Sequence, residues 1–202
     1  MKDRVTITRP SAPINVAIDL PRSKSISNRA LICASLAGDL SCVRDLSTAD
    51  DTRVLHQLLA ERPPVMHCGF GGTTFRFLLA WACVCEGAEH VITGGQRLLE
   101  RPHDDLINAL RSLGADIERT PIGFRVRGRK LKGGEVALDS PISSQFISAL
   151  MMIAPLMEEG LRIVWKGRRL SEPYVRMTAK VMGHFDVRVK EEGDAVVIPA
   201  AA

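Results

Sequence analysis

Aromatic residues and long apolar runs are scarce in this 202-residue sequence. Phe, Trp and Tyr make up 4% of the chain, which argues against a surface that stacks nucleic-acid bases. The nearly apolar stretches 75–85 and 146–157 are shorter than the roughly 18–20 residues of a membrane-spanning helix. No charged segment followed by an apolar one suggests a secretion signal. We therefore expect no nucleic-acid partner and no membrane partner.

Signatures of metals, disulfides and nucleotide cofactors are also missing. The five cysteines are odd in number and irregularly spaced, unlike a disulfide framework. No histidines pair at H-x-x-x-H spacing, and G-x-x-x-x-G-K-[ST], G-x-G-x-x-G and G-x-S-x-G do not occur. The sequence predicts no metal, no organic cofactor and a reducing cytoplasm. The expected free thiols are Cys33, Cys42, Cys68, Cys83 and Cys85.

The charge balance is nearly even, with 27 Lys and Arg against 23 Asp and Glu, a net charge of +4. With 46% hydrophobic residues, the composition is that of an ordinary globular chain. The small positive excess suits small anionic substrates at least as well as nucleic acid.

Apolar helices that end in glycine recur in 31–46, 75–93 and 146–165, each followed by a β-rich segment. The pattern predicts an α+β (α/β) fold of three β-α-β-α-β-β units around buried, parallel inner helices. Expected helices cover 25–37, 49–60, 73–86, 102–113, 143–157 and 173–182. Expected strands cover 5–7, 14–20, 41–46, 65–68, 90–93, 116–119, 124–127, 136–138, 161–165, 187–190 and 195–198.

The three inner helices begin with similar chemistry. Lys24-Ser25 opens the first, Gly71-Gly72-Thr73 the second and Ser143-Ser144-Gln145 the third. Backbone N–H groups are unpaired at a helix start, and the helix dipole favours anions there. A repeat would gather these starts at one end, where Arg29 and Arg101 add positive charge. The pattern predicts a site for a substrate with several negative charges, whereas ordinary N-capping would explain the hydroxyls alone.

The motifs resemble those of one enzyme family and follow its order along nearly the whole chain. They are Leu20-Pro21-Arg22-Ser23-Lys24-Ser25-Ile26-Ser27-Asn28-Arg29-Ala30-Leu31, Gly71-Gly72-Thr73-Thr74-Phe75-Arg76, Glu100-Arg101-Pro102, Ser143-Ser144-Gln145-Phe146 and Ser171-Glu172-Pro173-Tyr174. The chain resembles the N-terminal half of the 5-enolpyruvylshikimate-3-phosphate synthases (3-phosphoshikimate 1-carboxyvinyltransferases). Phe70 and Phe77 depart from the Asn and Pro that many members have at those positions.

The resemblance implies a transferase that moves the enolpyruvyl group of phosphoenolpyruvate to the 5-hydroxyl of shikimate 3-phosphate, on the route to chorismate. It implies no cofactor, and a catalytic role for Lys24. The implied shikimate 3-phosphate ligands are Lys24, Ser25, Arg29, Ser143, Ser144, Gln145, Ser171 and Tyr174. The implied phosphoenolpyruvate ligands are Lys24, Gly72, Thr73, Arg101 and Gln145. Glyphosate competes with phosphoenolpyruvate in this family, and Gly72 matches the position that commonly governs it.

The resemblance also implies a domain organisation. Residues 14–202 would form one of the two domains of the enolpyruvyl transferase fold, and 1–13 would be a strand segment that belongs to the other domain. The C-terminal catalytic domain would be absent, so we expect the chain to bind both substrates and to be incomplete for turnover. Its expected partner is a C-terminal domain or half-chain.

Two other functions stay open. The sister transferase that acts on UDP-N-acetylglucosamine has Lys-Asn where this chain has Lys24-Ser25, and it uses a loop cysteine, whereas Cys83 and Cys85 lie in an apolar stretch. A non-catalytic anion-binding or assembly module would use the same helix starts without chemistry.

Overall fold

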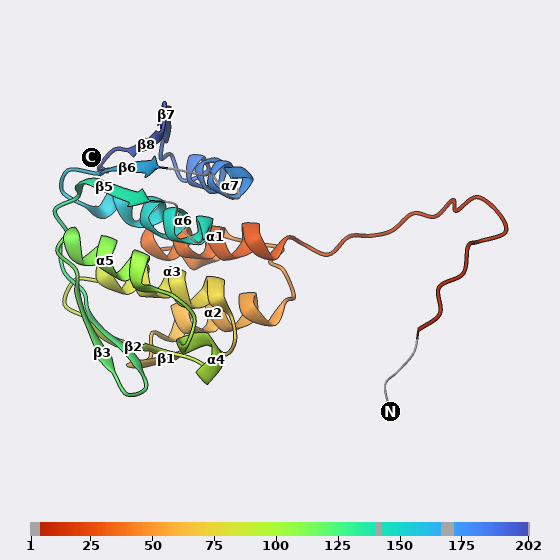
Figure 1. Cartoon of the computed structure of the whole chain (residues 1–202), viewed down its shortest axis with the longest axis horizontal. Helices are drawn as coiled ribbons and strands as arrows, with labels where there is room; N and C mark the ends of the chain where they lie inside the picture. Colours follow the sequence, from red (N-terminus) through yellow and green to blue (C-terminus); the bar gives the residue numbers. More distant parts are fainter. Residues whose placement is uncertain (1–4, 140–142, 167–171, 202) are drawn as a thin grey trace.

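A computed structural model describes residues 5–139, 143–166 and 172–201, in which a layer of helices lies between two sheets (Figure 1). The inner helices α1 (Lys24–Leu36), α3 (Gly72–Cys83) and α6 (Ser144–Ile153) contact one another. The outer helices α2 (Asp50–Glu61), α5 (Asp104–Ser112) and α7 (Glu172–Gly183) each contact two inner helices. The three outer helices therefore pack around the three inner ones, which places the core in the helical layer.

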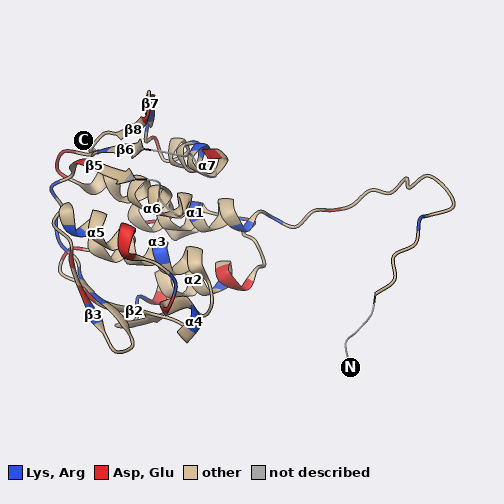
Figure 2. Ribbon diagram, viewed as in Figure 1, with Lys and Arg blue, Asp and Glu red and all other residues tan. Residues whose placement is uncertain are grey.

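The inner helices are buried because they are apolar nearly all round. Helix α6 has no charged residue and α3 has only Arg76, whereas the outer helices and strands carry most of the charge (Figure 2). Ten of the twelve residues of α3 and nine of the ten of α6 are buried. Pro155 follows α6 in a short 3-10 helix, Ala154–Leu156, so α6 ends earlier than the expected 157.

Two sheets have the same strand order and directions. The first has β1 (Val65–His67), β2 (Glu89–Thr93), β4 (Gly123–Arg127) and β3 (Asp116–Thr120) in the order β1-β2-β4-β3. The second has β5 (Gly134–Asp139), β6 (Leu161–Lys166), β8 (Ala195–Ile198) and β7 (Lys190–Glu192) in the order β5-β6-β8-β7. In each, the first two strands are parallel and connected through an inner helix, and the other neighbours are antiparallel. The second and third predicted units are thus confirmed.

The first predicted unit is a pair of helices without a sheet, so the strands expected at 5–7, 14–20 and 41–46 are wrong. Residues 5–20 run as an extended tail away from the helices (Figure 1), and Ile14, Val16 and Ile18 are exposed. A strand requires a neighbour for its backbone hydrogen bonds, and this tail has none among the described residues. The chain also passes from α2 to β1 through 62–64 alone, whereas α5 and α7 are each followed by a β-hairpin.

Local capping explains why the strand expected at 41–46 does not begin there. The Asp39 carboxylate accepts hydrogen bonds from the backbone N–H of Ser41 (2.8 Å) and from its hydroxyl (2.6 Å). These bonds hold Leu40–Cys42 in a 3-10 helix instead of a strand. Two smaller differences remain. The helix α4 (Gln96–Leu99) is not among the expected elements. Strand β7 begins at Lys190, not at the expected residue 187, and Val187 and Val189 pack against the core.

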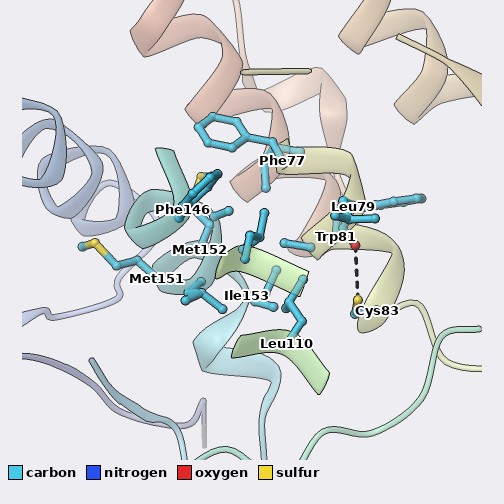
Figure 3. Close-up of a cluster of buried hydrophobic side chains, with 14 of the residues drawn as sticks. Phe77, Leu79, Trp81, Cys83, Leu110, Phe146, Met151, Met152 and Ile153 are labelled. Atoms are coloured by element: carbon cyan, nitrogen blue, oxygen red, sulfur yellow. Dashed lines mark hydrogen bonds between the residues drawn. The ribbon is translucent and has the colours of Figure 1, made fainter. Parts of the chain in front are cut away.

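Large side chains from the inner helices fill the centre of the helical layer. Phe77 of α3 lies beside Phe146 of α6, and Leu79 and Trp81 are buried farther along α3 (Figure 3). The buried Trp81 indole N–H donates to the Ser35 hydroxyl of α1 at 3.1 Å, so its one polar atom is satisfied. None of the helices in the described ranges is both long and apolar enough to cross a membrane.

Truncation of a core residue tests this packing. Leu79 is fully buried, so Leu79→Ala is expected to lower the free energy of unfolding by about 2–5 kcal/mol because it leaves a cavity. Ile122, which is 55% exposed, is the control, and its change to alanine is expected to cost less than about 0.5 kcal/mol. Equal losses in urea titrations would contradict the assignment of the core.

Thiol reactivity tests the burial of the cysteines. Burial raises the pKa of Cys33 and of Cys68 to about 12 and that of Cys85 to about 11, and it raises the pKa of Cys83 further. Cys42 is the one exposed cysteine among the five. We expect a thiol reagent at pH 8 to modify one cysteine rapidly in the native chain, and none in Cys42→Ser. Rapid modification of Cys42→Ser would contradict this burial.

Candidate functional site

The starts of α1, α2, α3 and α6 lie together at one end of the helical layer. Lys24 Nζ of α1 is 2.9 Å from Asp51 Oδ2 of α2. The Thr74 hydroxyl of α3 donates to the Asp51 carbonyl at 3.1 Å. The Gln145 side-chain amide of α6 donates to the Thr73 hydroxyl of α3 at 3.0 Å. Four positive dipole ends therefore converge, as the repeat predicted for the inner three.

The start of α7 joins this group through Arg29. Arg29 is 1% exposed, and its Nε donates to Thr178 Oγ1 of α7 at 2.7 Å. Its Nη2 donates to Ser148 Oγ of α6 at 3.0 Å, and its Nη1 to the Ser25 carbonyl at 3.0 Å. The guanidinium thus ties α1, α6 and α7 together from inside.

Burial gives the Arg29 charge an unusual environment. Desolvation lowers the pKa of Arg29 to about 10, partly offset by Tyr174. The rings of Phe77 and Tyr174 lie 5.3 and 5.7 Å from its guanidinium carbon. All of its nitrogens donate to protein atoms, so Arg29 forms the floor beneath the site. The sequence reasoning treated it as an open ligand because burial is not visible in the motif.

A second group lies at the start of α3. A Cβ added to Gly72 would lie 2.6 Å from Arg101 Nη1 and 3.7 Å from Arg76 Nη1. Both guanidinium groups therefore face the Gly72 backbone closely, and neither has an ion pair with a carboxylate among the described residues. No side chain caps α3. This corner has two positive charges and an uncapped helix start.

Arg76 is the functional candidate that the sequence reasoning missed. It is 4% exposed, and its Nη1 donates to Gln145 Oε1 at 2.6 Å. Its Nε is buried and has no hydrogen-bond partner within the described part of the chain. Desolvation, then the neighbouring charge of Arg101, lowers the pKa of Arg76 to about 10. Its sequence signals were its place as a cation inside the apolar stretch 75–85 and its position at the end of the motif that begins at Gly71.

His103 fixes the segment that carries Arg101. Its ring is 2% exposed and stacks on Phe75 at 4.5 Å between centroids. His103 Nε2 lies 2.9 Å from the Leu98 carbonyl, which fits an N–H donor at that nitrogen. Burial lowers the pKa of His103, which favours the neutral ring. The ring, packed at a tilt against Phe75 and bonded to Leu98, holds the loop before α5.

The hydroxyl candidates lie around the same end. The Ser143 hydroxyl caps α6 by accepting from the backbone N–H of Gln145 at 3.3 Å, as ordinary capping predicts. Ser144 is buried, Ser25 is half-buried, and Tyr174 is 44% exposed. Ser171 lies outside the described residues. Within those residues, no three His, Cys, Asp or Glu side chains lie where they could hold a metal ion.

Comparison with known proteins places this arrangement in a family. Residues 8–62 and 54–201 match the model of EPSP synthase (3-phosphoshikimate 1-carboxyvinyltransferase). The match divides within α2, near the point where the first unit passes directly into β1.

The curated relatives include 3-phosphoshikimate 1-carboxyvinyltransferases from Bacteroides fragilis strain YCH46 and Photobacterium damsela subsp. piscicida. The first is 40% identical over 199 residues, 96% of this chain and 48% of the relative. The second is 36% identical over 219 residues, 93% of this chain and 51% of the relative. The chain spans about half the length of these relatives.

A solved structure supports the fold. EPSP synthase from Acinetobacter baumannii matches with a TM-score of 0.76 at 18% identity, over 92% of this chain and 47% of that one. At this identity the likeness concerns the fold alone. The family match covers nearly the whole chain, and we conclude that the chain belongs to the EPSP synthase (3-phosphoshikimate 1-carboxyvinyltransferase) family.

Proposed function

We propose that this chain is the substrate-binding half of a 3-phosphoshikimate 1-carboxyvinyltransferase. The reaction would transfer the enolpyruvyl group of phosphoenolpyruvate to the 5-hydroxyl of shikimate 3-phosphate and release phosphate. One observation carries the proposal. Lys24, Arg76 and Arg101 lie at converging helix starts, and the two arginines have no carboxylate partner among the described residues. Such a site suits ligands with several negative charges.

Shikimate 3-phosphate would bind on the side formed by α1, α6 and α7. There, hydroxyls and helix N–H groups would hold its phosphate, and Tyr174 would lie against its ring. Arg29 would act from below by holding the three helix starts in register. The residues proposed to form this side are Lys24, Ser25, Ser143, Ser144, Gln145, Ser171 and Tyr174, with Arg29 beneath them.

Phosphoenolpyruvate would bind toward the start of α3. The Gly72 N–H would donate without obstruction from a side chain, and Arg101 would hold a carboxylate or phosphate. Thr73 and Gln145 would line the same corner. Lys24 would lie between the two ligands and neutralise charge that develops during transfer.

The remaining chemistry would come from a second domain or half-chain. We propose that it supplies the acid–base carboxylates, that residues 1–13 pack with it, and that the chain does not turn over alone. We also propose a cytoplasmic location, because five unpaired thiols suit a reducing compartment.

Binding of shikimate 3-phosphate tests the role of Lys24. Lys24→Met removes one charge-assisted contact and is expected to weaken binding by roughly 10–100-fold in calorimetric titrations. Lys132→Met is the control, because Lys132 is exposed and pairs with Glu159. Lack of saturable binding in the parent, or equal affinities in the parent and Lys24→Met, would refute the proposal.

Gly72→Ala tests the corner at α3. Its methyl group would displace Arg101 Nη1, which is the mobile end of a side chain. We expect phosphoenolpyruvate binding, measured in the presence of shikimate 3-phosphate, to weaken roughly tenfold because a charge-assisted bond is misaligned. Shikimate 3-phosphate binding alone is expected to be unchanged. Gly183→Ala is the control, because a Cβ there meets nothing within 4 Å, and an equal effect of both variants would contradict this assignment.

A further inference from the structure

The carboxylate of Asp51 lies inside the group of helix starts. Asp51 is in the first turn of α2, its Oδ2 is 2.9 Å from Lys24 Nζ, and its side chain is 28% exposed. Its Oδ1 would lie 3.1 Å from a Cβ on Gly71. This negative group therefore fills the junction of α1, α2 and α3.

Its position differs from that of the neighbouring carboxylate. Asp50 is in the same helical turn, but its side chain is 85% exposed and pairs with Arg53 one turn along α2. Figure 2 shows this acidic turn of α2 beside the start of α1. The two residues contribute the same charge to the start of α2, and only Asp51 reaches Lys24.

Resting on the proposed function, we propose that Asp51 is a built-in counter-ion that determines which anions Lys24 accepts. It occupies the α1–α2–α3 junction, where α2 and α3 begin without a side-chain cap. An anion that approaches Lys24 from this junction meets a carboxylate and is repelled. A ligand contacts Lys24 only when it binds from the sides of α6 and α3, where other hydrogen-bond donors add contacts. Asp51 is thus a specificity-determining residue that disfavours small anions.

The physical expectation follows from charge. Loss of the carboxylate frees Lys24 and removes repulsion of the incoming anion, and an exposed ion pair of this kind corresponds to a change of up to about fivefold in an equilibrium constant. Screening by salt reduces the effect. Asparagine has the same shape as aspartate, so the contact at Gly71 remains.

The test compares Asp51→Asn with Asp50→Asn in the full chain. We expect inorganic phosphate to bind Asp51→Asn about fivefold more tightly than the parent at low ionic strength, with a smaller difference at 0.5 M salt. Asp50→Asn is expected to match the parent. In the ligand-free protein, the NMR resonances of the Lys24 ε-methylene are expected to shift in Asp51→Asn and to stay in place in Asp50→Asn.

The outcomes separate this inference from the proposed function. If shikimate 3-phosphate binds the parent and both variants bind phosphate equally, the role of Asp51 is overturned and the proposed function stands. If phosphate binds Asp51→Asn more weakly than it binds the parent, Asp51 assists anions and the inference is overturned. If no anion binds the parent or Asp51→Asn, both are overturned.

Discussion

The arrangement of the helical layer depends on one buried cation. Arg29 donates to groups on α1, α6 and α7, and it can remain charged at 1% exposure because each nitrogen has a partner. Removal of a partner such as Thr178 would leave part of a buried charge unsatisfied, which is far more costly than the loss of a surface hydrogen bond. This requirement fixes how far each helix extends toward the site.

Parallel helices that start together create an electrostatic cost. Their dipoles place like partial charges side by side, so the shared end is favourable only when negative groups balance it. The chain supplies part of that balance itself, with the first-turn acids of α2. Arg76 and Arg101 at the α3 start have no ion pair with a carboxylate among the described residues, and an anion bound there would stabilise the domain.

Sequence reasoning succeeded where local chemistry decides structure. Apolar periodicity, capping residues and terminal glycines located six helices and the two repeated sheets, because those signals act within one element. It failed at 14–20 and 41–46, because alternation describes a strand that still needs a partner. It did not predict the burial of Arg29 and Arg76, because burial depends on helices distant in the sequence.

The direct passage from α2 to β1, without a hairpin, shows that the helices and the sheets have separate roles in this fold. No described residue of the proposed site lies on a strand; all lie at helix starts or in the loop before α5. The sheets cover the helical layer from outside, and the helices together with the loop before α5 set the geometry of the proposed site. A change in the length of a hairpin that leaves the helices in place would therefore leave the proposed binding residues in place as well.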